Sequence, residues 1–394
     1  MEKDALQKRR LGELFWSWGY LTHYNVKLFD PRSAGSAREE LTDVDVLGHK
    51  VSPNLHEERV CGDCRTLKGM SPINRAFWQR GVMDYLRISR GYIVVRKPPT
   101  ENHKQTAHDL GITLFDDQTF DIYRSKLGLI PKLDTMKMFK KESWDYFQNN
   151  IPSRQGLSSL LSYRYYGYWT DRPNRALRFT LMEVFGARDK LDEKQKHHIA
   201  LVLDSATHFS SSFLSMIAEL FQIHAVTDNK ELLDDYLKAY IYGGREVYAH
   251  LNQITKKLIQ LKQGDQNTLY KEEEGKERPT DLSLPEWDTF LQLYRTLLEA
   301  PGIAVEVPRI LRFALFERIL YNNDSVKLMD AIPNITTHAV KLSADVVTYF
   351  LKASQLLQKF GKDIITVLDD LLLSLKKEDE AGILAKSQHK KQAK

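Results

Sequence analysis

Cysteine is almost missing from this chain of 394 residues, which contains only Cys61 and Cys64. Two neighbouring cysteines cannot build a disulfide framework, so a disulfide-stabilised secreted fold is excluded. Long hydrophobic runs are missing too, because charged or polar residues interrupt every stretch of about 18 residues. We therefore expect no membrane helix and no membrane partner. The first residues, MEKDALQKRR, are charged, so we expect no signal peptide and a reducing, cytoplasmic setting.

A strong excess of either charge is also missing. The net charge is +5, with 42% hydrophobic and 28% charged residues. This composition is ordinary for a globular protein, and the mildly basic balance allows a polyanionic partner without requiring one. The length exceeds what one hydrophobic core normally serves, so two or three domains are expected.

Two short segments rich in β-forming residues carry carboxylates. Polar and apolar residues alternate over 42–47, which places Asp45 on one face of a strand. The next predicted strand, 59–67, has Asp63 and Arg65 on a common face. If these strands are neighbours, the two acids converge, and close carboxylates repel each other unless a cation lies between them. Mg²⁺, or Mn²⁺ in its place, suits such a pair because one or two carboxylates are enough to hold it.

This stretch resembles the core of the PD-(D/E)XK, or restriction endonuclease-like, superfamily. Members place an acid at the end of one strand and an acid-x-lysine sequence on the next. Asp45 matches the first acid, and the segment from Asp63 through Cys64 to Arg65 lies where acid-x-lysine is expected. The resemblance implies a Mg²⁺- or Mn²⁺-dependent endonuclease acting on DNA, with Asp45, Asp63 and the Cys64 carbonyl as metal ligands.

The chain departs from the family pattern at Arg65, which replaces the lysine thought to position the attacking water. Arginine is planar and effectively never deprotonated, so the exchange predicts intact binding with impaired hydrolysis. Lys68 is the alternative residue for orienting water or phosphate. Two hypotheses therefore stay open: a metal-dependent nuclease, and a catalytically inactive nuclease-derived module that binds nucleic acid or a partner protein.

The first predicted helix, residues 5–23, carries a further acid. Family members often have an acid on this helix that reaches the metal, and the resemblance makes Glu13 the candidate. An exposed helical glutamate is the alternative interpretation.

The order of predicted elements defines the fold class. Residues 1–124 read as helix, strands, helix, strand, helix, strand, which predicts an α/β restriction endonuclease-like domain with a mixed sheet flanked by helices. Beyond it, apolar residues recur at helical spacing and predict an all-α C-terminal region. We divide that region into a helical domain at 125–262, a linker or loop at 263–279, a helical domain at 280–385 and a basic tail at 386–394.

Arginines interleaved with tyrosines fill residues 152–178. Aromatic rings stack on bases and guanidinium groups bind phosphates, so this composition suits a nucleic-acid surface, although tyrosines also pack domain interfaces. Six residues are predicted to contact nucleic acid: Arg75 and Gln79 on the helix that follows Ser71, and Arg164, Arg172, Arg175 and Arg178. The oligomeric state stays open, a dimer included.

The two cysteines, with His49 and His56 upstream, have the residue types of a zinc site. On a regular strand, however, Cys61 and Cys64 point to opposite faces and cannot hold one ion. We therefore expect two small buried thiols.

Overall fold

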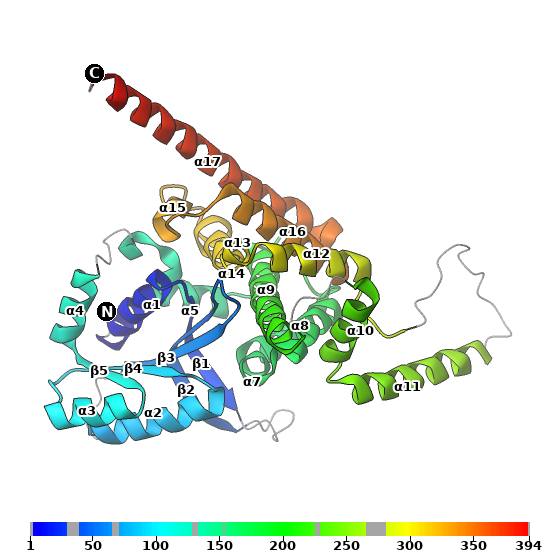
Figure 1. The fold of residues 1–394 in the computed structure, drawn as a ribbon, viewed down its shortest axis with the longest axis horizontal. Helices are drawn as coiled ribbons and strands as arrows, with labels where there is room; N and C mark the ends of the chain where they lie inside the picture. The colour runs from blue at the N-terminus through cyan, green and yellow to red at the C-terminus, as the bar shows by residue number, and fades with distance from the viewer. Residues whose placement is uncertain are drawn as a thin grey trace.

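The computed structural model describes residues 3–29, 39–64, 71–127, 133–152, 154–224, 229–264 and 281–392. Within these ranges the N-terminal part forms a five-stranded sheet with helices, and the rest of the chain is helical (Figure 1). The predicted mixed sheet followed by a helical region is therefore confirmed.

The sheet contains β1 (Leu21–Phe29), β2 (Glu40–Val51), β3 (Glu57–Cys64), β4 (Arg90–Val95) and β5 (Ile112–Asp116), in that spatial order. β1, β2 and β3 pair antiparallel, whereas β4 is parallel to both β3 and β5. Parallel neighbours need a crossover connection, and α2 (Pro72–Leu86) and α3 (Glu101–Asp109) supply the two helices for it.

Helices cover both faces of the sheet, with α1 (Lys3–Ser17) on one side and α2 and α3 on the other (Figure 1). The alternation along β3 explains this arrangement, because successive side chains point to opposite faces. Val60 and Cys64 join the buried cluster that contains Phe15 of α1, whereas Cys61 joins the cluster that contains Met83 of α2.

The first helix is shorter than predicted. It ends at Ser17, and residues 21–23 belong to β1 rather than to the helix. Gly19 adopts a φ of +86°, a left-handed conformation that glycine reaches without strain, and it turns the chain into the strand. Leu21 continued the helical spacing of apolar residues, which explains the error.

The predicted start of α2 is confirmed. Ser71 is its N-cap, and its Oγ accepts a 3.2 Å hydrogen bond from the backbone N–H of Asn74. Pro72 occupies the first helical position, where a missing N–H costs nothing.

The remaining helices are α4 (Asp117–Lys126), α5 (Lys141–Asn149), α6 (Ser158–Ser162), α7 (Tyr168–Thr170), α8 (Pro173–Ala187), α9 (Lys196–His224), α10 (Lys230–Ile241), α11 (Arg245–Gly264), α12 (Trp287–Glu299), α13 (Pro301–Ala304), α14 (Val307–Phe313), α15 (Leu328–Ala331), α16 (Thr337–Ala353) and α17 (Leu357–Gln392). Short 3₁₀ turns are η2 (Leu133–Thr135), η3 (Lys137–Phe139) and η4 (Arg154–Leu157), and π-helical turns are η5 (Tyr163–Gly167) and η6 (Ala314–Leu320). The long helix α9 is central, since it packs against α8, α14, α16 and β2.

The two parts share one core. A single buried cluster contains residues from Leu11 on α1 to Leu375 on α17. Trp16 of α1 joins the parts directly, because its Nε1 donates a 2.6 Å hydrogen bond to the carbonyl of Ala331. Arg309 in turn donates a 3.0 Å hydrogen bond to the carbonyl of Trp16. The helical region therefore completes the packing of α1.

In two segments the structure differs from the prediction. Residues 386–392, predicted as part of a basic tail, continue helix α17. The predicted linker at 263–279 begins inside α11, which extends to Gly264, and its other residues lie outside the described ranges. The limits at 125 and 280 stay predictions.

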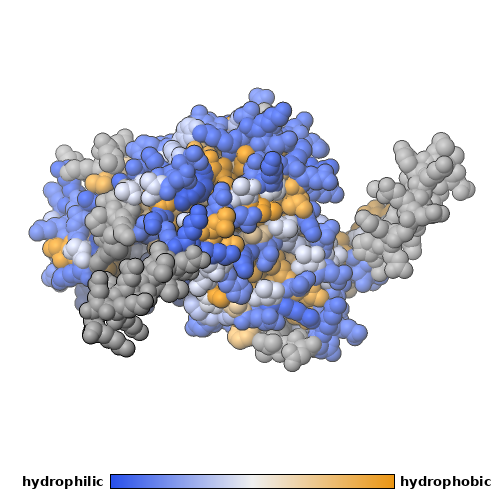
Figure 2. Space-filling model, turned by 90° about the horizontal axis from the view of Figure 1, so that it is seen from above, coloured by the Kyte–Doolittle hydropathy of each residue, from blue (hydrophilic) through white to orange (hydrophobic). Residues whose placement is uncertain are grey.

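The face shown in Figure 2 is mostly hydrophilic, with hydrophobic residues in patches between the hydrophilic ones. Among the described helices, none combines the length and the apolar character needed to cross a membrane.

Candidate functional site

Asp45 and Asp63 lie next to each other on neighbouring strands. Val46 of β2 faces Gly62 of β3, and each acid is one step beyond this pair. The backbone N–H of Cys64 donates a 2.7 Å hydrogen bond to Asp45 Oδ2, so this carboxylate reaches the end of β3. Both acids are buried, with 3% and 4% of their surface exposed. The fold therefore brings together the two acids that the sequence singles out.

Each of these acids has a cation of the chain beside it. Lys8 on α1 places its Nζ 2.8 Å from Asp45 Oδ1 and donates a 2.6 Å hydrogen bond to Asn25. Arg75 in the first turn of α2 binds Asp63 with two N–H groups: Nη2 lies 2.9 Å from Oδ1, and Nε bonds Oδ2. Arg75 was predicted to contact nucleic acid, and Lys8 was not predicted as a site residue at all.

The charges of this four-residue site balance. Burial raises the pKa of the Asp45 carboxyl, Lys8 opposes that shift, and the negative charge of Asp63 adds to it. Lys8 and Arg75 thus occupy positions beside the two acids that a metal ion would compete for.

Glu13 is buried on α1 and forms ion pairs with Arg9, at 2.8 Å, and with Arg124. Within the described ranges, no three His, Cys, Asp or Glu side chains gather closely enough to hold a metal ion. Glu13 is therefore not the exposed helical glutamate of the alternative interpretation, and its role at the metal site stays a prediction. Its partners compensate its burial, since two guanidinium groups neutralise its carboxylate.

The remaining donors meet the minimum that Mg²⁺ requires. The ion needs one or two carboxylates, and its other positions accept water, phosphate or a carbonyl such as that of Cys64. Asp45 and Asp63 fit this requirement once their oxygens are released from the ion pairs. Arg65 and Lys68, the two predicted water-orienting residues, lie outside the described residues.

The two cysteines point to opposite faces of the sheet, as predicted. Cys61 lies in the cluster beneath α2, where Gln79 Nε2 donates a 3.3 Å hydrogen bond to its Sγ, and Cys64 lies in the cluster beneath α1. Burial raises the pKa of the Cys61 thiol to about 12 and also raises that of Cys64. Because they lie on opposite faces of the sheet, the two thiols cannot ligate one zinc ion together.

Two of the predicted nucleic-acid contacts are wrong. Gln79 of α2 is 2% exposed and bonds to Cys61 of the sheet, and Arg164 is 5% exposed and pairs with Asp204 of α9. Neither side chain can reach a nucleic acid. Arg175, by contrast, has an exposed side chain, and the Arg178 guanidinium lies over the ring of Tyr242 at 5.1 Å.

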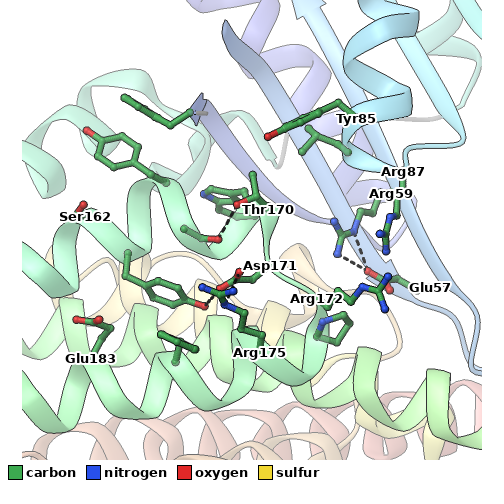
Figure 3. A pocket seen from close by; sticks show the side chains of 18 of the residues that line it. Glu57, Arg59, Tyr85, Arg87, Ser162, Thr170, Asp171, Arg172, Arg175 and Glu183 are labelled. Atoms are coloured by element: carbon green, nitrogen blue, oxygen red, sulfur yellow. Dashed lines mark hydrogen bonds and ion pairs between the residues drawn. The ribbon is translucent and has the colours of Figure 1, made fainter. Parts of the chain in front are cut away.

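A cleft of about 1140 Å³ separates the sheet from helices α7 and α8 (Figure 3). Arg172 and Arg175 line it, as do Arg59 of β3 and Arg87 at the end of α2, which the sequence did not single out. Asp45 and Asp63 are not among its lining residues. The chain thus has two separate candidate sites, the paired acids and this cleft.

Comparison of the chain with protein-family models, curated proteins and solved structures gives no match.

Proposed function

We propose that this chain is a metal-dependent nuclease that hydrolyses phosphodiester bonds in DNA at Asp45 and Asp63. The observation that supports it most is the position of the Asp45 carboxylate, which bonds the Cys64 N–H on the strand that carries Asp63. Two adjacent buried acids are costly to a fold unless each is compensated, and apolar residues would serve a purely structural role at lower cost. A functional role accounts for their presence.

In this proposal Asp45, Asp63 and the Cys64 carbonyl hold Mg²⁺ or Mn²⁺. The bound ion would lower the pKa of a water molecule and stabilise charge on the phosphate. Lys8 supplies the cation that the family pattern would place at Arg65. It already contacts Asp45, and its side chain is 20% exposed, so it can orient water or phosphate at the ion's edge.

In this proposal Arg75 has one role in the metal-free protein and another in the metal-bound protein. While it binds Asp63 through two N–H groups, it neutralises the acid in the absence of metal. With an ion held by that carboxylate, the guanidinium would be free to donate its N–H groups to the oxygens of a phosphate. The predicted contact between Arg75 and nucleic acid then applies to the metal-bound state.

A second candidate function is binding without hydrolysis. The ion pair in which two N–H groups of Arg75 bind Asp63 favours binding without hydrolysis. An arginine that stays in place leaves the acid unable to ligate metal. Arg65 in place of lysine points the same way.

A plasmid-nicking assay in Mg²⁺ and in Mn²⁺ tests the proposal, together with direct titration of Mn²⁺ binding by electron paramagnetic resonance. We expect the natural protein to bind Mn²⁺ and nick DNA, and Asp63→Asn to lose both properties. Lys8→Ala should keep Mn²⁺ binding while cleavage falls about 100-fold, the scale of one positioned transition-state group. The matched controls are Asp109→Asn and Lys104→Ala, which alter exposed residues of α3.

Metal binding that persists in Asp63→Asn would contradict the proposed ligands. If the natural protein and Arg65→Lys both fail to nick DNA while DNA binding persists, the second candidate function is correct. Unchanged cleavage in Lys8→Ala would show that Lys8 does not act in hydrolysis, and it would not affect the roles proposed for Asp45 and Asp63.

A further inference from the structure

The cleft has one wall from each part of the chain. Strands β1 and β3 and the end of α2 form the first wall, and the segment from α6 to α8 forms the second. The walls meet where the rings of Phe29 and Tyr166 lie 4.1 Å apart between centroids. A volume of about 1140 Å³ is slightly above the usual range for small-molecule sites, so the cleft can receive a ligand of nucleotide size.

Arginines dominate one end of the cleft. Figure 3 shows Arg59, Arg87 and Arg172 gathered around Glu57, from β3, from the end of α2 and from the start of α8. Arg59 pairs with Glu57 at 2.8 Å. Burial alone would raise the pKa of Glu57, but its bonds to His49 and Arg59 outweigh burial and lower that pKa to about 2. Three guanidinium groups therefore face one ionised carboxylate.

Most of the other acids in the cleft are already bound. Asp171 pairs with Arg175 at 3.0 Å, and Glu219 accepts a hydrogen bond from Tyr240. Glu183 lies apart from Arg87 and Arg172 in Figure 3. No ion pair joins either of these two arginines to a described residue, so both guanidinium groups are available to an anionic ligand.

Aromatic rings line the cleft beside these arginines. Tyr85 of α2 is 45% exposed, a large fraction for an aromatic side chain, and Trp169 and Tyr166 come from the facing wall. An exposed ring in the same cleft as guanidinium groups that form no ion pair with a described residue is the combination that binds a base and its phosphate together. A plain phosphate site would have no use for the rings, and an apolar pocket would have none for the arginines.

We infer that this cleft binds a nucleoside phosphate, either free or as part of a single strand, with Arg87 and Arg172 on the phosphate and Tyr85 on the base. The inference does not rest on the proposed hydrolysis, because Asp45 and Asp63 lie outside the cleft.

The test uses the full chain and a fluorescein-labelled dT12 strand in EDTA, with binding followed by fluorescence anisotropy. Arg87→Ala/Arg172→Ala should weaken binding at least about tenfold, and Tyr85→Ala about fivefold, since each removes one class of contact. The control Arg188→Ala/Arg295→Ala removes the same charge outside the cleft and should change affinity less than about twofold. Asp63→Asn should bind like the natural protein, which separates this site from the proposed catalytic one.

Competitors identify the source of the ligand. If dTMP displaces the strand and thymidine does not, the cleft accepts a free nucleotide, and if only unlabelled dT12 competes, it accepts a strand. Equal losses in the cleft and control double variants would overturn the inference. It would also fail if thymidine competed as well as dTMP, or if neither dT12 nor dTMP bound.

Discussion

Arg75 holds Asp63 through two N–H groups, with 2.9 Å between Nη2 and Oδ1. Both side chains are largely buried, at 11% and 5% exposure. The pair stabilises the fold and occupies the acid that the proposed metal site needs. In the proposed function, a metal ion at Asp63 has to replace this ion pair.

Replacing Arg75 should change how the stability of the protein responds to Mg²⁺. Without divalent ions, Arg75→Ala leaves Asp63 buried and uncompensated and should lower the free energy of unfolding by about 3–5 kcal/mol. Mg²⁺ should restore part of this loss and stabilise the variant more than the natural protein, as measured by thermal unfolding with and without Mg²⁺. Arg80→Ala, which breaks an exposed pair with Asp84 on the same helix, should cost less than about 1 kcal/mol. An Arg75→Ala variant that ignores Mg²⁺ would argue against metal binding at Asp63.

Two glycines predict opposite effects of the same substitution. A Cβ at Gly12 would lie 1.9 Å from the hydroxyl oxygen of Tyr24 and 2.5 Å from its ring, so Gly12→Ala should force α1 away from β1 and cost about 1–3 kcal/mol. A Cβ at Gly81 on α2 meets nothing within 4 Å, so Gly81→Ala should stabilise by about 0.5–1 kcal/mol. Chemical denaturation measures both, and equal effects would contradict the close approach of α1 to the sheet.

His208 should make the protein acid-sensitive. Burial lowers its pKa in the fold from 6.5 to about 3; Asp204 opposes this shift, and Arg312 and Arg164 reinforce it. Below pH 6.5 the unfolded chain binds a proton that the folded chain does not, so the free energy of unfolding falls as the pH drops from 6.5 toward 3. The contribution of one histidine approaches about 1.4 kcal/mol per pH unit.

Urea unfolding between pH 7 and 4.5 tests this prediction. His208→Gln should flatten the pH dependence, whereas His108→Gln should leave it unchanged because that side chain is 82% exposed. Parallel slopes for His208→Gln and the natural protein would show that other groups cause the acid sensitivity.

Asp204 balances two buried arginines at once. It pairs with Arg312 at 2.7 Å and with Arg164, and all three side chains are buried. Asp204→Asn should cost about 3–5 kcal/mol, because two guanidinium groups lose their counter-charge inside the protein. Asp189→Asn, at a position that is 76% exposed, is the control and should be nearly neutral. A loss below 1 kcal/mol in Asp204→Asn would mean that the arginines find other partners.

The pairing of β2 with β3 could be predicted because it depends on local pattern. Alternation over 42–47 and the strand that carries Asp63 are visible in the sequence, and they place the acids side by side. The partners of the acids could not be predicted in the same way. Lys8 and Arg75 reach them from two helices on opposite faces of the sheet, and no sequence period encodes that geometry.

Arg164 is a second residue whose environment could not be predicted from the local sequence. Its neighbours in sequence are aromatic and basic, which is typical of a nucleic-acid surface. Its partner Asp204 lies 40 residues later on α9, and that ion pair buries it. No local signal placed Arg59 and Arg87 in the cleft, because they come from β3 and the end of α2 and meet Arg172 of the helical region only in the folded chain. The local composition indicated a nucleic-acid surface, but it could not indicate which arginine faces solvent.

The hydrogen bond from Trp16 to the carbonyl of Ala331 has a consequence for synthesis of the protein. The two residues are 315 positions apart, so the bond forms only after most of the chain has left the ribosome. Until then Trp16, which is 1% exposed in the folded chain, lacks part of its cover and is accessible to chaperones or to other nascent chains. The N-terminal third is therefore synthesised before the segment that completes the packing of α1. The yield of folded protein in the cell should depend on how quickly translation reaches α15.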